Sequence, residues 1–136
     1  MVTKTSITDC RVGQADITAL TRVLIVDDMA TSRELVKAAL ASRQYEMTEA
    51  ASGKEALELI SNKPFDLVLL DLEMSDMNGI EVIRQLRKRH TPIQLPIIML
   101  TSSESGDDIV TALETGANDY VVKGDETWIS TYQNQT

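Results

Sequence analysis

The sequence is poor in the features that mark several classes of protein. A single cysteine, Cys10, stands among 136 residues, so no disulfide can form within the chain and we expect a reducing compartment, the cytoplasm. No apolar run approaches the roughly 18 residues that cross a bilayer, and no signal segment opens the chain, so neither secretion nor membrane spanning is expected. Thirteen basic residues against twenty-one acidic ones give a net charge of −8, which argues against unaided binding to nucleic acid.

Aromatic residues are also scarce, at 4 %, so the core must be mostly aliphatic. The apolar content of 43 % and the charged content of 25 % are ordinary for a globular protein, and the length suits one domain. Residues 1–21 have weak periodicity and are expected to form a flexible extension; the alternative is a short helix at 16–20 that docks on the body. Residues 22–136 are expected to form the domain.

Four continuously apolar runs predict buried parallel strands at residues 23–26, 67–70, 97–100 and 120–122. A more polar run at 45–50 predicts a strand at an edge of the sheet. Segments with helical periodicity separate these runs on short connections, which is typical of α/β units around a parallel sheet.

Capping residues predict where the helices begin. Thr31 or Ser32 is expected to cap the first helix, Ser52 and Glu55 form a capping box for the second, and Asn78 begins the third. The fourth is expected from about residue 105 to 115, before Gly116. Residues expected to face the core are Leu35, Val36, Ala39 and Leu40, then Ala56, Leu57 and Ile60, then Ile80, Ile83 and Leu86, then Ile109, Ala112 and Leu113. A solvated face is expected for Glu81, Arg84, Arg87 and Lys88.

Polar side chains follow the predicted strands where each one ends. Asp27 and Asp28 follow the first run, Asp71 follows the run at 67–70, and Thr101 and Lys123 follow the last two. The carboxyl ends of the strands form the ligand crevice of an open parallel sheet. Each residue alone has an ordinary structural explanation, such as a turn former or a solvated lysine. Their coincidence on one rim favours a site for a divalent cation and a phosphoryl group.

The chemistry of this set points to phosphoryl transfer. Mg²⁺ prefers oxygen ligands, so Asp28 and Asp71 can bind it if their strands are neighbours, while Asp27 could act through water. Asp71 ends a rigid strand and is the best nucleophile, giving an acyl phosphate. Phosphoryl transfer depends mainly on positioning and charge neutralisation, which Mg²⁺, Lys123 and the hydroxyl of Thr101 can supply. We interpret the chain as a phosphate-controlled switch.

These residues resemble the receiver domain of bacterial two-component response regulators. The stretches that carry the resemblance are Leu24-Ile-Val-Asp-Asp28, Asp71-Leu-Glu-Met74, Met77-Asn-Gly79, Thr101-Ser102, and Gly116-Ala-Asn-Asp-Tyr120 with Lys123. Their separations, 43 residues from Asp28 to Asp71, 30 more to Thr101 and 22 more to Lys123, are typical of the family. The resemblance covers about residues 22–124. It implies a flavodoxin-like α/β fold, a doubly wound sheet of five parallel strands in the order 2-1-3-4-5.

The resemblance also implies a set of roles. Asp71 would be phosphorylated by a histidine kinase or a phosphotransfer protein, and the chain would catalyse only its own phosphorylation and dephosphorylation. Mg²⁺ would be held by Asp28, Asp71 and the backbone carbonyl of Glu73, with Asp27 acting through water.

Further implied roles concern the switch and its lifetime. On phosphorylation Thr101 would move toward the phosphoryl group and Tyr120 would turn inward, which would change the surface of the fourth helix and fifth strand. That surface could serve an output domain, a partner protein or a homodimer. Glu73 and Ser103 would tune the hydrolysis of the acyl phosphate.

The chain departs from the family pattern in three places. Ser75 stands where the family usually has proline, which is expected to loosen the loop slightly. Gly124 stands where proline usually follows Lys123, and a cis bond before glycine would cost about 2.5–4 kcal/mol. Thirteen residues follow Lys123, so a shortened last helix is expected.

Two alternatives stay open. One is a binding module of the same fold that no longer uses phosphate, motivated by Gly124 and the short last helix. The other is an enzyme that acts on small molecules. An aspartyl phosphatase is considered because Glu73 lies two residues after Asp71. A flavin protein is the second candidate, although Asp27 and Asp28 would repel the flavin phosphate. The receiver itself could be a single-domain regulator or part of a longer chain.

Overall fold

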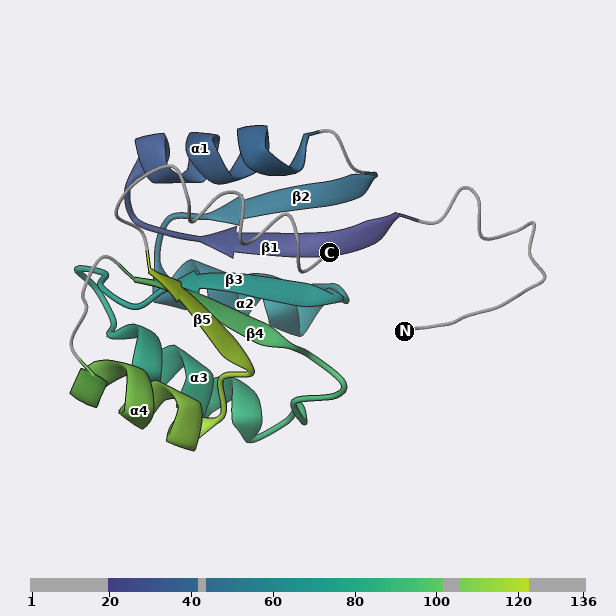
Figure 1. The fold of residues 1–136 in the computed structure, drawn as a ribbon. Helices are drawn as coiled ribbons and strands as arrows, with labels where there is room; N and C mark the ends of the chain where they lie inside the picture. The colour runs from purple at the N-terminus through teal and green to yellow at the C-terminus, as the bar shows by residue number, and fades with distance from the viewer. Residues whose placement is uncertain (1–19, 42–43, 102–105, 123–136) are drawn as a thin grey trace.

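The computed structural model describes residues 20–41, 44–101 and 106–122, in which strands and helices alternate along the chain (Figure 1). The predicted extension at 1–21 lies outside these residues except for its last two, and so do Ser103, Lys123, Gly124 and the predicted last helix. The bounds are β1 Thr21–Val26, α1 Ala30–Leu40, β2 Tyr45–Ala50, α2 Gly53–Asn62, β3 Leu67–Asp71, α3 Gly79–Arg87, β4 Ile97–Thr101, α4 Gly106–Thr115 and β5 Asp119–Val122. All five strands lie where the sequence predicts them.

The strands form one parallel sheet in the order β2-β1-β3-β4-β5. This order is the predicted one, and it places the polar strand β2 at an edge. The central strands β1 and β3 pair in register, with Val26 opposite Leu70. Asp71 at the end of β3 pairs with Leu100 of β4, so the polar residues that follow these strands meet at one edge.

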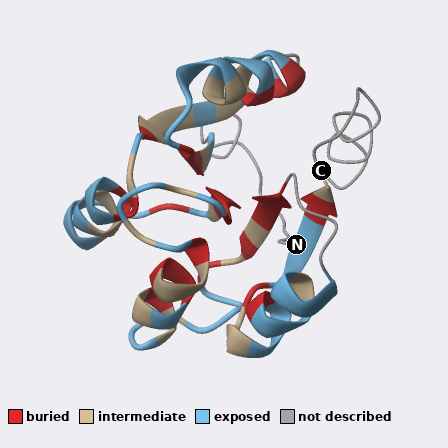
Figure 2. Cartoon of the chain, turned by 90° about the vertical axis from the view of Figure 1, so that its left-hand side faces the viewer, coloured by how far each residue is buried: buried red, intermediate tan, exposed pale blue. Residues whose placement is uncertain are grey.

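Helices cover both faces of the sheet (Figure 1). On one face α1 packs Val36 and Leu40 against residues of the central strands, among them Val23 and Leu69. On the other face α2, α3 and α4 cover a larger core that includes their residues Ala56, Val82, Ile83, Leu86 and Ala112. In Figure 2, which looks toward the carboxyl ends of the strands, the buried residues lie on the strands and on the helix sides that face them.

The start of α1 differs from the prediction. The helix begins at Ala30, and its N-cap is Met29, whose side chain makes no capping hydrogen bond. Neither Thr31 nor Ser32 caps it, because the helix begins before them. The turn between β1 and α1 is instead stabilised by the N–H of Met29, which donates to Oδ1 of Asp27 at 2.9 Å. Leu35 is 52 % exposed rather than inward, since Val36, Ala39 and Leu40 form the face that meets the sheet.

Ser52 caps the helix α2 as predicted, while the Glu55 carboxylate bonds one residue further back than in the standard capping box, and Asp76 is an additional partner. The N–H of Glu55 donates to the Ser52 hydroxyl at 3.1 Å, and the Glu55 carboxylate accepts from the N–H of Ala51 at 2.8 Å. Asp76, in the loop after β3, also accepts N–H groups from the first two residues of α2. This loop is therefore fastened to α2.

Asn78 caps the start of the helix α3 as predicted, but the last cation of the helix, Arg87, does not belong to a solvated face. The Asn78 side chain accepts the N–H of Ile80 at 2.7 Å. The guanidinium of Arg87 donates to the carbonyls of Gly116, His90, Thr91 and Leu95 and to the side chain of Asn118, so it fastens the end of α3 to the turns before β4 and β5. Burial lowers the pKa of Arg87. Its solvated-face assignment was wrong because the chain folds back on the end of α3 and brings Gly116 and Asn118, 29 and 31 residues away, to the guanidinium.

The helix α4 is less buried than its periodicity predicts. Of its residues only Ala112 is buried, Ile109 is half-buried, and Leu113 is 37 % exposed, which corrects its inward assignment. Gly116 ends the helix at a φ of +138°, where a Cβ would also lie 2.7 Å from Cγ of Arg87. No helix among the described residues is long and apolar enough to cross a membrane.

Candidate functional site

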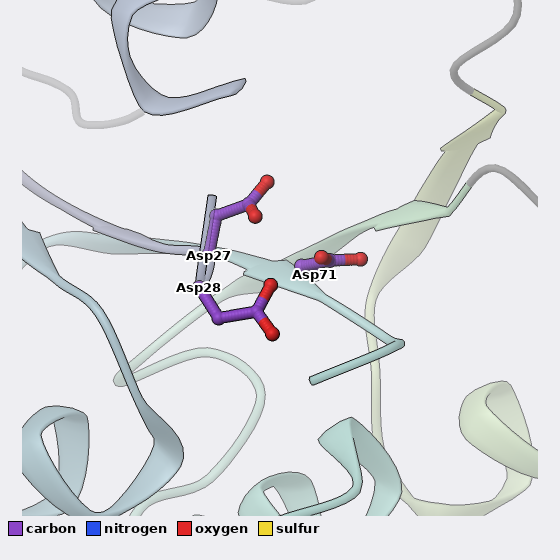
Figure 3. Close-up of side chains that lie close together, drawn as sticks. All are labelled: Asp27, Asp28 and Asp71. Carbon is purple, nitrogen blue, oxygen red and sulfur yellow. The ribbon is translucent and has the colours of Figure 1, made fainter. Parts of the chain in front are cut away.

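Three carboxylates converge at the carboxyl ends of β1 and β3. Asp27 and Asp28 directly follow β1, and Asp71 is the last residue of β3. Each offers an oxygen within 4.8 Å of the others (Figure 3). Asp27 is 1 % exposed and Asp71 is 5 % exposed, while Asp28 lies closer to solvent. The sequence predicted this convergence on condition that the strands were neighbours, and they are.

The backbone beyond the strands holds this arrangement. The N–H of Asp27 donates to the carbonyl of Ala50 at 3.1 Å, which extends the contact between β1 and β2 past the end of β1. Likewise the N–H of Leu72 donates to the carbonyl of Leu100 at 3.1 Å, beyond the end of β3. The backbone hydrogen bonds of the sheet thus continue next to Asp27 and Asp71, so these residues are held by the sheet and not by a loop alone.

Each carboxylate also accepts a backbone N–H. Asp27 accepts from Met29 at 2.9 Å, Asp71 from Glu73 at 3.1 Å, and Asp28 from Ser75 at 3.2 Å. Hydrogen bonds to a carboxylate stabilise its charged form, which offsets part of the repulsion among three neighbouring acids.

Arg33 of α1 contacts the backbone of the acidic cluster and links it to β2. Arg33 donates to the backbone carbonyl of Asp27 at 2.6 Å and to the Glu49 carboxylate of β2 at 2.8 Å, and Lys37 donates to Glu49 at 2.9 Å. The hydrogen bonds from Lys37 and Arg33 lower the pKa of Glu49. The sequence interpretation missed Arg33. The available signal was two cations four residues apart on the helix that follows the acidic pair, with an acid on the edge strand.

The other predicted site residues are placed only in part. Thr101 ends β4 fully buried, one residue after Leu100, which is the pairing partner of Asp71. Tyr120 lies on β5 opposite Met99 with 38 % of its surface exposed. Glu73 is exposed in the loop after β3. Ser103 and Lys123 lie outside the described residues, so their predicted roles stay predictions.

The cluster has an open side. A hollow of about 530 Å³ lies beside the loop after β3 and is lined in part by Asp28, Glu73, Ser75 and Asp108. Asp28 is therefore the carboxylate of the cluster that borders this hollow. The acidic lining favours the approach of cations over that of anions.

This donor set fits a hard divalent cation. Carboxylate oxygens are the ligands that Mg²⁺ prefers, and Mg²⁺ commonly takes one or two of them and keeps several waters. The side chains come from adjacent strands and lie within reach of one ion. Three like charges so close together repel one another, and a bound cation would relieve that repulsion.

Comparisons with known proteins agree with this geometry. Residues 23–128 match the response regulator receiver domain family. The chain is 40 % identical over 101 residues to the phosphate regulon transcriptional regulatory protein PhoB of Pseudomonas aeruginosa, covering 74 % of the chain and 44 % of that protein. It is 41 % identical over 108 residues to the transcriptional regulatory protein ResD of Bacillus subtilis, covering 79 % of the chain and 44 % of that protein. The chain thus spans less than half the length of these relatives.

Solved structures give the same result. The chemotaxis response regulator CheY4 of Vibrio cholerae superposes with a TM-score of 0.76 at 32 % identity, covering 87 % of this chain and all of that one. A CheY-like receiver domain protein of Methanospirillum hungatei superposes with a TM-score of 0.75 at 30 % identity, covering 86 % of this chain and 94 % of that one. The acidic residues at the strand ends, the strand order and these matches agree, and the chain belongs to the response regulator receiver domains of two-component systems.

Proposed function

We propose that this domain is a phosphorylatable receiver in which Asp71 accepts a phosphoryl group from a histidine kinase or a phosphotransfer protein. The observation that carries the proposal is the convergence of Asp27, Asp28 and Asp71 within 4.8 Å at the ends of two adjacent strands. Such a site combines a nucleophile with the ligands of a divalent cation. The family of the chain supports the same assignment.

In the proposed reaction a carboxylate oxygen of Asp71 attacks the phosphorus of a phosphohistidine. The new P–O bond forms as the P–N bond breaks, and the electron pair of the P–N bond stays on the imidazole nitrogen, which takes up a proton. The N–H of Glu73 and the rigid end of β3 orient the Asp71 carboxylate for this attack.

The remaining site residues neutralise charge. Asp28, Asp71 and the backbone carbonyl of Glu73 would hold Mg²⁺, with Asp27 acting through water, and the ion would supply positive charge beside the phosphoryl oxygens. Thr101 would donate its hydroxyl to a phosphoryl oxygen. The ammonium of Lys123 would bind another phosphoryl oxygen.

The acyl phosphate would then act through a shift between two packings. Thr101 would move toward the phosphoryl group and Tyr120 would turn from its exposed position into the space released. The affected surface lies over α4 and β5, where Val110, Leu113 and Tyr120 are exposed. An output domain, a partner protein or a second copy of the chain would bind there. Glu73 and Ser103 would set the hydrolysis rate.

Mass spectrometry tests the proposal. The chain is incubated with acetyl phosphate and Mg²⁺, and the intact mass is measured against an Asp71→Asn control. We expect the mass to rise by one phosphoryl group in the parent and not in the variant, and the gain to disappear with EDTA. No gain would instead indicate a phosphate-independent binding module. Steady turnover of phosphate esters without a kinase would indicate an enzyme.

A further inference from the structure

We infer that the backbone N–H of Ser75 is a positioning group for the cation site, because it holds the Asp28 carboxylate toward Asp71. The inference rests on the proposed function and adds to it a residue outside the assigned ligand set. Ser75 itself is expected to touch neither the cation nor the phosphoryl group.

The contact joins two separate parts of the chain. The N–H of Ser75 lies 3.2 Å from Oδ2 of Asp28, 47 residues away in the sequence. The corresponding N–H groups on Asp27 and Asp71 come from Met29 and Glu73, each two residues further along. Those two contacts are local and need no distant segment of the chain. The contact on Asp28 depends on the whole loop being placed beside β1.

The loop that carries Ser75 is itself held in place. The carboxylate of Asp76 accepts the N–H groups of Gly53 at 3.2 Å and Lys54 at 3.3 Å, at the start of α2. The N–H of Gly79 donates to the carbonyl of Leu72 at 3.0 Å and closes the loop at its other end. Because the loop is held at both ends, the N–H of Ser75 has a fixed position. The hydrogen bond therefore restricts the position of the Asp28 carboxylate.

Asp28 needs this restriction more than its neighbours do. It lies closer to solvent than Asp27 and Asp71, and repulsion from both would favour a side-chain position turned away from them. The N–H occupies Oδ2, which leaves Oδ1 for a cation. Holding a ligand in its binding position before the ion arrives lowers the cost of binding.

The sequence departure at residue 75 makes this contact possible. Proline has no N–H, so a chain with proline here could not make the same hydrogen bond. Serine in place of proline is expected to loosen the loop slightly. The structure adds an opposing effect, since the same residue supplies a donor that ties the loop to the end of β1.

Two variants at this position separate the N–H from the side chain. Ser75→Pro removes the donor, and Ser75→Ala removes the hydroxyl but keeps the donor. The dissociation constant for Mg²⁺ is measured by titration calorimetry in the parent and both variants. We expect Ser75→Pro to raise it about tenfold, within the range known for groups that orient metal ligands. Ser75→Ala should stay within about twofold of the parent.

A second readout distinguishes positioning from damage to the fold. Autophosphorylation with acetyl phosphate is followed while Mg²⁺ is varied. We expect Ser75→Pro to raise the Mg²⁺ concentration for half-maximal rate while leaving the rate at saturating Mg²⁺ close to the parent's. Equal Mg²⁺ affinity in the parent and in Ser75→Pro would overturn the inference. A variant with a lower rate at saturating Mg²⁺ but an unchanged half-maximal Mg²⁺ concentration would also overturn it.

An NMR measurement keeps the inference testable if Ser75→Pro fails to fold. The amide proton of Ser75 should shift upfield in Asp28→Ala, which lacks the acceptor, and an unchanged resonance would overturn the inference. A parent that binds no Mg²⁺ and takes no phosphoryl group would refute the proposed function itself. A parent that does both, with a Ser75→Pro variant that behaves identically, would refute only the role of Ser75.

Discussion

Replacing Asp28 by asparagine should stabilise the protein when no divalent cation is present. The variant keeps the shape of the side chain and an oxygen that can accept the N–H of Ser75, but it removes one of three negative charges whose oxygens lie within 4.8 Å of one another. The free energy of unfolding should rise because the folded state crowds these charges and the unfolded state does not.

The magnitude follows from the separation. Asp28 faces two other charges, and each pair of unit charges 4.8 Å apart repels by about 0.9 kcal/mol at a dielectric constant of 80 and by about 3.5 kcal/mol at 20, so the two pairs together repel by about 1.7–7 kcal/mol. The more exposed position of Asp28 favours the lower part of this range. The weaker hydrogen bond from Ser75 to a neutral amide subtracts roughly 0.5–1 kcal/mol. We therefore expect a net gain of about 1–2 kcal/mol.

Thermal unfolding in EDTA at pH 7 measures this gain. One kcal/mol corresponds to about 4–8 °C for a domain of 60–100 residues, so the midpoint should rise by several degrees. Glu58→Gln is the matched control, because it removes an equal charge from an exposed residue of α2 outside the cluster. Its midpoint should stay near that of the parent.

Added Mg²⁺ should reverse the order of stability. A ligand at one hundred times its dissociation constant stabilises the folded state by about 2.7 kcal/mol. The parent should gain this amount, while Asp28→Asn, with one carboxylate fewer, should gain less. An Asp28→Asn variant that unfolds at a lower temperature than the parent in EDTA would refute the reasoning, since repulsion would then not be the dominant interaction in the cluster.

Three further substitutions test parts of the fold. Gly79→Ala would place a Cβ 2.8 Å from two backbone atoms at the end of β3, and urea unfolding should report a loss of about 1–3 kcal/mol; an unchanged midpoint would contradict the close approach. Arg87→Met should cost about 2–3 kcal/mol because several partly buried carbonyls lose their donor, whereas Arg84→Met, on an exposed side chain, should cost below about 1 kcal/mol; equal losses would refute the fastening role. Burial raises the pKa of Asp66, but hydrogen bonds from Arg22 outweigh it and the net pKa is lowered. Asp66→Asn should therefore cost up to about 1 kcal/mol at pH 7, and acid titration of both proteins should show this difference vanishing as pH falls below about 4, through the pKa of the folded state; a difference independent of pH would contradict it.

The sequence alone determined the elements that depend on neighbouring residues. Continuous apolar runs mark strands buried on both faces, so β1, β3 and β4 could be located within a residue or two. Capping depends on side chains a few positions apart, so Ser52 and Asn78 were assigned correctly. The acidic residues were identified because each directly follows a predicted strand, and a parallel sheet brings all its carboxyl ends to one edge.

The tertiary structure decided everything that depends on distant partners. Arg87 was assigned to solvent, yet it binds the carbonyl of Gly116 and the side chain of Asn118, which lie 29 and 31 residues away. Arg33 reaches Glu49 of β2 across 16 residues, and Ser75 reaches Asp28 across 47 residues. Periodicity tells which side chains share a face of a helix, but the packing of that helix decides which of them touch the sheet. Local propensities therefore located the elements and the carboxylates, whereas the groups that hold those carboxylates became visible only when the chain was folded.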